Sequence, residues 1–203
     1  MAFLSTLFRH IKYGDPVIVV SGLPRSGTSM LMKMLESGGL TVWTDSQRQA
    51  DDDNPKGYFE LERVKTLDKG VDKSWVRESR GKVLKVISFL LKDLPSDNFY
   101  KVIFVRRNLD EVLASQNKML VNRGETKDAA SDEKMKQNYE THLRKTDYFL
   151  KHEKNFEVLY LDHRQIIENG PEQARKISAF LGGSLNVDAM AQAVDPALYR
   201  NRA

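Results

Sequence analysis

Short apolar runs alternate along the chain with stretches whose apolar residues recur at helical spacing. The apolar runs predict strands and lie at residues 17–20, 40–43, 83–87, 101–105 and 157–161. Strands separated by helical or loop sequence are typical of a parallel sheet wrapped by helices. We therefore expect an α/β fold with three layers, α/β/α, around a central parallel sheet.

Helical spacing predicts three of the intervening helices. A short helix is predicted at residues 61–67, and a long one with a charged outer face at residues 135–150. The last is predicted to begin near Pro171 and to stop at Gly182 and Gly183, because proline favours a helix start and glycine a helix end.

The amino-terminal residues 3–11 also carry a helical apolar stripe. The stripe is too short to span a bilayer and lacks the layout of a signal peptide. We expect it to pack on the body of the protein. The alternative is docking on a membrane surface or a partner, helped by Arg9 and Lys12.

Composition excludes several kinds of site. The 203 residues suit one α/β domain over residues 1–203. The 32 basic and 28 acidic residues leave a net charge of +4, which suits an anionic ligand but predicts no specific nucleic-acid binding. Without cysteine there is no disulfide, thiolate nucleophile or thiolate metal site, and the four histidines show no metal-ligand spacing. We expect no metal and take the cytoplasm as the default compartment.

The first predicted strand runs into a tight glycine turn and a helix, the usual construction of a phosphate-binding loop. Gly22 and Gly27 have the spacing of a Walker A loop, and Ser29 retains its hydroxyl. However, Thr28 stands where that loop has lysine, and Arg25 brings a cation instead. Backbone N–H groups and the positive end of the helix dipole would bind an anion here. The loop therefore indicates an anion site that does not suit the γ-phosphate of ATP.

A second strand-to-helix junction follows residues 101–105. Arg107 lies at the carboxyl end of this strand, and Ser115 follows two turns into the next helix. Asn108, with Glu111 three residues later, predicts a start that is similar to a capping box. An arginine and a hydroxyl that face one ligand suit a second phosphate. The alternative is an arginine paired with a surface carboxylate and a serine that faces solvent.

Together the two junctions resemble the sulfotransferase superfamily, whose members bind 3′-phosphoadenosine 5′-phosphosulfate (PAPS) on a P-loop-like α/β fold. Residues 23–29, Leu-Pro-Arg-Ser-Gly-Thr-Ser, are similar to the family's 5′-phosphosulfate loop, and Arg107-Asn108 with Ser115 is similar to its 3′-phosphate motif. The resemblance spans most of residues 15–120. It implies a PAPS-dependent sulfotransferase with a P-loop NTPase-like fold. After transfer of its sulfuryl group, the donor would leave the enzyme as adenosine 3′,5′-bisphosphate (PAP).

The resemblance also implies roles for individual residues. The 5′-phosphosulfate would be held by Pro24, Arg25, Ser26, Gly27, Thr28 and Ser29. The 3′-phosphate would be bound by Arg107 and Ser115, with Arg200 of the basic tail as a further contact. Sulfuryl transfer builds negative charge on the bridging oxygen, which a guanidinium stabilises. We therefore expect Arg25 to be catalytic.

At the position of the general base the chain departs from the family pattern. Many cytosolic members carry Lys-Thr-His at the end of the strand that aligns with residues 84–87, whereas this chain has Lys85 followed by Ile87 in place of the histidine. Glu60 is the substitute that we expect to act as base, in a segment that is similar to one at the acceptor site of some bacterial members. Its alternative role is to favour a helix dipole from the first turn. Lys85 is predicted to be catalytic, with a solvated lysine at a strand end as the alternative.

Two other functions remain open. An apolar strand that ends in Asp162 could supply the magnesium ligand of a P-loop phosphotransferase or nucleotide hydrolase. The missing histidine at position 87 also leaves open a catalytically silent nucleotide-binding protein.

As partners we expect a nucleotide sulfate donor and an acceptor, a hydroxyl or an amine, which the sequence does not identify. We expect no transmembrane segment, and a homodimer is left open.

Overall fold

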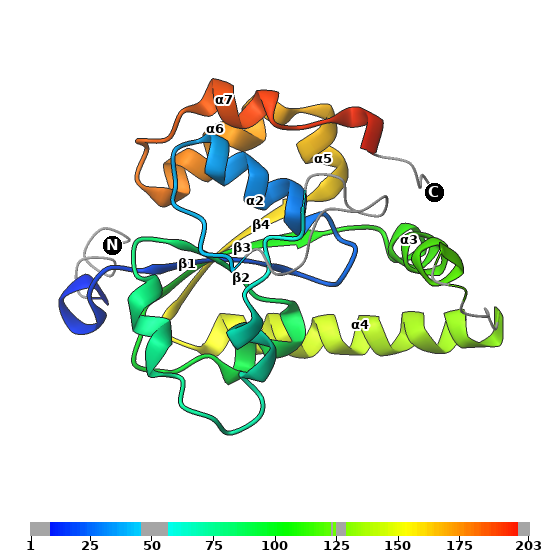
Figure 1. Cartoon of the computed structure of the whole chain (residues 1–203), viewed down its shortest axis with the longest axis horizontal. Helices are drawn as coiled ribbons and strands as arrows, with labels where there is room; N and C mark the ends of the chain where they lie inside the picture. The colour runs from blue at the N-terminus through cyan, green and yellow to red at the C-terminus, as the bar shows by residue number, and fades with distance from the viewer. Residues whose placement is uncertain (1–8, 46–56, 123, 125–128, 199–203) are drawn as a thin grey trace.

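Four parallel strands form the central sheet of the computed structural model, which describes residues 9–45, 57–122, 124 and 129–198 (Figure 1). The strands are β1 (Val17–Gly22), β2 (Val83–Lys85), β3 (Tyr100–Arg106) and β4 (Phe156–Asp162). Their order is β2-β1-β3-β4, and every pairing is parallel. The register places Gly22 beside Val105, so β1 and β3 end next to each other at one edge of the sheet.

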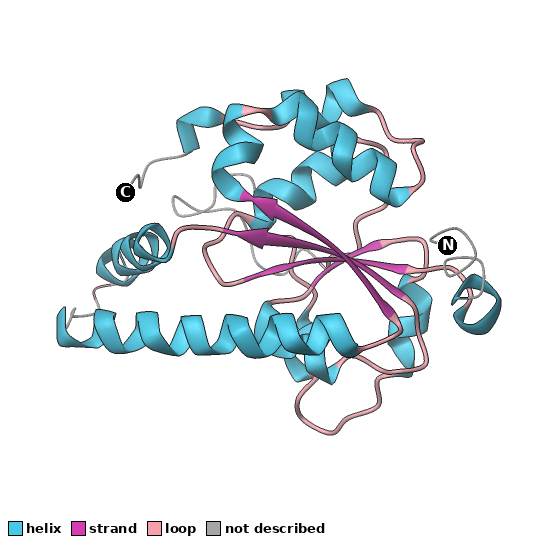
Figure 2. Ribbon diagram, turned by 180° about the vertical axis from the view of Figure 1, so that it is seen from behind, coloured by secondary structure: helices cyan, strands magenta, loops and turns pink. Residues whose placement is uncertain are grey.

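Different helices cover the two faces of the sheet. One face carries α2 (Thr28–Ser37), α5 (His163–Glu168), α6 (Gly170–Leu181) and α7 (Val187–Gln192) (Figure 1). The other carries α4 (Ala129–His152) and the short 3₁₀ helices η1 (Glu62–Thr66), η2 (Ser74–Ser79) and η3 (Ser88–Asp93) (Figure 2). Two further labelled elements are α3 (Leu109–Asn122), beyond the end of β3, and η4 (Pro196–Leu198). Residues 9–13 near the amino terminus are also helical. The predicted three-layer α/β/α arrangement is confirmed.

Alternate residues of β1 divide between two hydrophobic cores. Val17 and Val19 belong to the core beneath α4 and the 3₁₀ helices, whereas Ile18 and Val20 belong to the core beneath α2, α6 and α7. Because successive side chains of a strand point to opposite faces, a strand between two apolar layers must be apolar throughout. Every residue of β1 is buried, and this anchors the loop that follows it.

Residues 40–43 were predicted to be a strand, and this prediction is wrong. The segment makes one isolated bridge, from Val42 to Val83. Directly after it the chain turns away from the sheet, where Thr44 Oγ1 donates a hydrogen bond to the carbonyl oxygen of Glu60 at 2.7 Å. The neighbouring strand β2 is itself only three residues long, so it offers little backbone for a longer ladder.

The helix predictions are confirmed with small changes. The short helix is a 3₁₀ helix, the long one extends to residues 129–152, and the last has proline in its first turn and a left-handed Gly182 at its end. Residues 3–8 of the amino-terminal stripe lie outside the described residues. Of its described part, Ile11 is exposed, and the contact with the body is made by Arg9, which binds Glu157 and the carbonyl oxygen of Lys154. No helix in the described ranges is long and apolar enough to cross a membrane.

Candidate functional site

The loop after β1 depends on glycine at both of its ends. A Cβ on Gly22 would lie 2.5 Å from Ser26 Oγ and 2.7 Å from the carbonyl oxygen of Val105, distances that no side chain tolerates. Gly27 precedes α2 with a φ of 101°, in the left-handed region that favours glycine. The close approach of β3 and the start of α2 therefore explain the two glycines that the sequence singled out.

Arg25 connects the loop to the second junction. Its Nε donates a hydrogen bond to Ser115 Oγ at 3.0 Å, and its carbonyl oxygen accepts one from Arg107 Nη1 at 3.0 Å. Arg25 also has a φ of 68°, a left-handed conformation that costs about 1–3 kcal/mol in a residue other than glycine. The two junctions that the sequence predicted to face one ligand are thus in direct contact.

Arg107 is held by a buried carboxylate. Its Nε lies 2.8 Å from Glu111 Oε2, one helical turn later, and the two side chains are only 8% and 6% exposed. Asn108 caps α3 as predicted, because its Oδ1 accepts a hydrogen bond from the N–H of Asp110 at 2.8 Å. The alternative of a surface ion pair and a solvent-facing serine is wrong, since both the ion pair and Ser115 are buried.

The preceding arginine points elsewhere. Arg106 binds the carboxylate of Asp147 on α4 at 2.7 Å and lies over the ring of Tyr160. Neighbouring side chains at the end of a strand alternate between its faces. Arg106 and Arg107 therefore separate, and it is Arg107 that bonds to the loop.

Lys85 brings a further cation to the loop from β2. Its Nζ donates hydrogen bonds to Ser29 Oγ at 3.1 Å and to the carbonyl oxygen of Tyr58 at 2.6 Å. The alternative of a solvated lysine at a strand end is therefore wrong. A lysine reaches the first turn of α2 from the neighbouring strand, although the Walker A lysine position is occupied by Thr28.

Glu60 follows two residues after Tyr58, whose carbonyl oxygen binds Lys85. Its carboxylate is 3.2 Å from Lys65 Nζ, and its side chain is 23% exposed. Glu60 precedes η1, whose N-cap is Leu61, so the alternative of a glutamate inside the first helical turn is wrong. Arg200, the further predicted contact, lies outside the described residues.

Two histidines to which the sequence assigned no role lie near the carboxyl ends of the strands. His163, the first residue of α5, lies against Gly27, because a Cβ on that glycine would be 2.4 Å from His163 Cδ2. His142 on α4 reaches the segment after β2, where its Nε2 is 2.9 Å from Ser88 Oγ. The sequence signal for His163 is its position directly after a strand of the parallel sheet, not a metal-ligand spacing.

A protein-family comparison identifies the fold's relatives. The family described as "Sulfotransferase domain" matches residues 15–201, nearly the whole chain. The chain belongs to the sulfotransferase family. No curated protein matches this sulfotransferase at a significant level.

Solved sulfotransferases share the fold at low sequence identity. The sulfotransferase domain from the curacin biosynthetic pathway has a TM-score of 0.57 and 12% identity, covering 93% of this chain and 92% of its own. Mouse sulfotransferase SULT7A1 complexed with PAP has a TM-score of 0.54 and 20% identity, with coverages of 89% and 62%. A sulfotransferase from Alicyclobacillus acidocaldarius has a TM-score of 0.51 and 14% identity, with coverages of 86% and 83%.

The loop of this sulfotransferase has the chemistry that an anionic nucleotide needs. No side chain caps α2 at Gly27, and the N–H groups of a helix's first turn have no partners within the helix. Ser26 Oγ is buried and has no hydrogen-bond partner in the described part of the chain. Arg25 adds a positive charge within the loop, and Arg107 and Lys85 add two more beside it. The residues present therefore fit a polyanionic ligand.

Asp162, the residue proposed as a magnesium ligand in the rival interpretation, has a structural task in this sulfotransferase. Its Oδ1 accepts a hydrogen bond from the N–H of Gln165 at 3.1 Å and so caps α5. Among the described residues no three acidic or histidine side chains gather as a metal site would require. The family match over residues 15–201 favours the sulfotransferase interpretation over the phosphotransferase.

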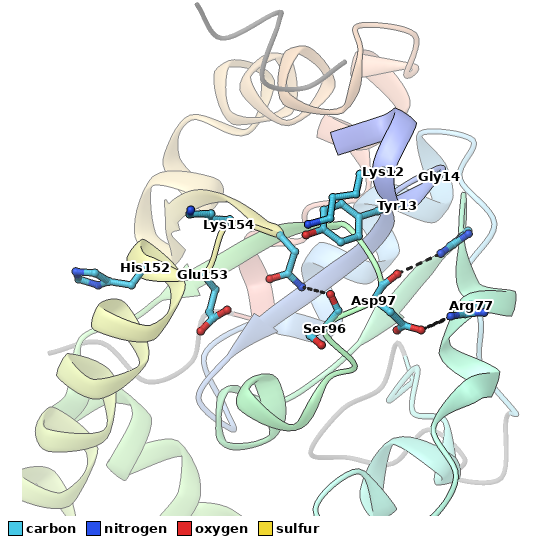
Figure 3. A pocket seen from close by; sticks show the side chains of 11 residues that line it. Lys12, Tyr13, Gly14, Arg77, Ser96, Asp97, His152, Glu153 and Lys154 are labelled. Atoms are coloured by element: carbon cyan, nitrogen blue, oxygen red, sulfur yellow. Dashed lines mark hydrogen bonds and ion pairs between the residues drawn. The ribbon is translucent and has the colours of Figure 1, made fainter. Parts of the chain in front are cut away.

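A hollow in the surface lies at the opposite edge of the sheet (Figure 3). It is lined by residues that precede β3 and β4, including Ser96 and Asn155, and by Arg77, which is paired with Asp97. None of the predicted site residues lines it. The hollow is therefore separate from the site at the carboxyl ends of the strands.

Proposed function

We propose that this protein transfers a sulfuryl group from PAPS to a hydroxyl or amine acceptor. The observation that carries the proposal is the contact of Arg25 with both Ser115 and Arg107, which unites a phosphate-binding loop with a second group of anion-binding side chains. A donor with phosphates at both its 5′ and 3′ positions needs two such groups at a fixed separation. Two of the similar structures are described as complexes with PAP, which supports this donor class.

The proposed donor contacts divide between the two junctions. The loop residues 24–29 would bind the 5′-phosphosulfate through backbone N–H groups and hydroxyls. Arg107 and Ser115 would bind the 3′-phosphate, which distinguishes this donor from ATP. Arg200 is retained as a further proposed contact. Because Arg107 is charged and held in place by Glu111, it would bind a phosphate with little loss of conformational freedom.

Sulfuryl transfer breaks the bond between sulfur and the bridging phosphate oxygen and forms a bond between sulfur and the acceptor. The leaving PAP takes the negative charge of the bridging oxygen, and the acceptor loses a proton. We propose that Arg25 and Lys85 stabilise that growing charge, since electrostatic groups in place before reaction cost no reorganisation. Lys85 already donates to Ser29 in the first turn of α2, where this charge would lie.

We further propose that Glu60 accepts the acceptor's proton. Glu60 follows Tyr58 closely in the chain, and the carbonyl oxygen of Tyr58 binds Lys85. Glu60→Gln keeps the shape of the side chain but removes its basicity, so turnover is expected to fall by about 10²–10⁴-fold. PAP affinity, measured by calorimetry on the same variant, should not change. Turnover equal to that of the unmodified protein would exclude Glu60 as the base.

The donor assignment is tested by calorimetric titration with PAP and with ATP, each with and without magnesium. We expect metal-independent binding that prefers PAP by at least about tenfold, because only PAP presents a phosphate to Arg107. Magnesium-dependent binding of ATP would instead support the phosphotransferase. Tight PAP binding without turnover across a panel of alcohols, phenols and amines would support the catalytically silent protein.

A further inference from the structure

An imidazole lies directly behind the phosphate-binding loop. The position that a Cβ on Gly27 would take is 2.4 Å from His163 Cδ2 and 3.1 Å from its Nε2. The ring therefore packs against the backbone of Gly27. His163 is itself 6% exposed, so solvent does not separate it from the loop.

The fold fixes the backbone that carries this ring. His163 is the first residue of α5 and follows β4 directly, and Asp162 caps the same helix. Ile166, one turn later, is completely buried in the core beneath α2 and α6. The backbone that carries the imidazole is thus fixed by a strand, a helix cap and a buried side chain.

The groups around the ring favour its neutral form. Burial lowers the pKa of His163 to about 4, and the charge of Arg107 acts in the same direction. Glu111 and Asp162 oppose this shift but do not outweigh it. A neutral imidazole can pack beside Arg107, whereas a second cation there would repel it.

We propose that His163 is a positioning residue of the donor site, whose imidazole supports Gly27 and so sets the position of the loop's backbone N–H groups. This inference rests on the proposed donor function. A loop that holds Arg25, a residue other than glycine, in a left-handed conformation needs surroundings that fix its backbone. The ring supplies such a surface at Gly27, two residues after Arg25.

The proposal also has an electrostatic consequence. A phosphate group bound by the loop would bring negative charge close to the imidazole. Negative charge favours the protonated form of histidine and raises its pKa. PAP binding and the protonation of His163 should therefore be linked, although the ring touches the loop and is not proposed to touch the ligand.

Calorimetric titration with PAP tests the positioning role in three variants. His163→Ala removes the ring and is expected to weaken PAP binding by about 10–100-fold, since small displacements of binding groups are costly. His163→Phe retains a flat ring against Gly27 and should recover most of that loss. His152→Ala, at the exposed end of α4, serves as the matched control and should bind PAP as the unmodified protein does. PAP affinity unchanged in His163→Ala would overturn the proposal.

An NMR titration of the imidazole resonances gives a second measurement. It uses the unmodified protein, so it does not require that any variant folds. We expect a pKa near 4 for His163 without PAP and a higher value with saturating PAP. Resonances that PAP does not move would overturn the proposal. If the unmodified protein binds no PAP, the proposed donor is wrong. If it binds PAP and the pKa of His163 does not change, only this inference fails.

Discussion

Arg25→Ala is expected to reduce sulfuryl transfer to a small residual rate while leaving the protein folded. Loss of one group that stabilises developing negative charge typically costs about 10²–10³-fold in turnover, or about 3–4 kcal/mol. Arg25 has this role in our proposal, and its side chain also holds Ser115 Oγ at 3.0 Å. The substitution therefore removes a positive charge from the loop. It also removes the hydrogen bond to Ser115, one of the residues proposed to bind the 3′-phosphate.

Folding should survive, because the backbone contact of Arg25 does not need its side chain. The carbonyl oxygen that accepts the hydrogen bond from Arg107 is kept by alanine. One lost hydrogen bond from a charged group costs about 1.5–3 kcal/mol, which corresponds to a fall in Tm of about 3–12 °C in a protein of this size. Turnover with a saturating donor and thermal unfolding are the two measurements.

Arg25→Lys provides the matched control for charge. Lysine restores a positive charge but not the planar group that donates to Ser115, so turnover should be intermediate. If Arg25→Ala retained more than about a tenth of normal turnover, the loop arginine would not be the group that stabilises the leaving oxygen.

Arg107→Ala is expected to weaken PAP binding and to destabilise the fold as well. The phosphate contact of a charged donor is worth about 1.5–3 kcal/mol, so the Kd for PAP should rise about 10–100-fold. Removing Arg107 also breaks the buried ion pair with Glu111, at a cost of about 3–5 kcal/mol. We expect Tm to fall by about 6–20 °C. Calorimetry with PAP and thermal unfolding report the two effects separately.

Two controls separate binding from stability. The double variant Arg107→Met with Glu111→Leu removes both buried charges, so it should recover much of the lost stability without recovering PAP affinity. Arg106→Ala removes the adjacent arginine, which is half exposed and paired with Asp147, and should leave PAP affinity unchanged. If Arg107→Ala bound PAP with normal affinity, the assignment of the 3′-phosphate to Arg107 would be wrong.

Local chemistry was predictable from the sequence wherever a residue acts on its own neighbours. The spacing of Gly22 and Gly27, the cap at Asn108 and the stop at Gly182 all depend on backbone conformations within a few residues. The prediction of a strand at residues 40–43 was wrong because strand formation depends on a partner that is distant in the sequence. The apolar residues there suit a strand, but a strand needs a long enough neighbour, and β2 is short.

The chain by itself determined the fold class, the loop that suits an anion and the arginine and serine of the second junction. Only the tertiary structure decided that Arg25 joins those junctions, that Glu111 holds Arg107 in a buried pair, and that His163 lies behind Gly27. The physical reason is the strand order β2-β1-β3-β4, which brings together at one edge of the sheet segments that are far apart in the sequence. Hydrophobic periodicity reports which face of an element is buried, but it carries no information about which element lies against that face.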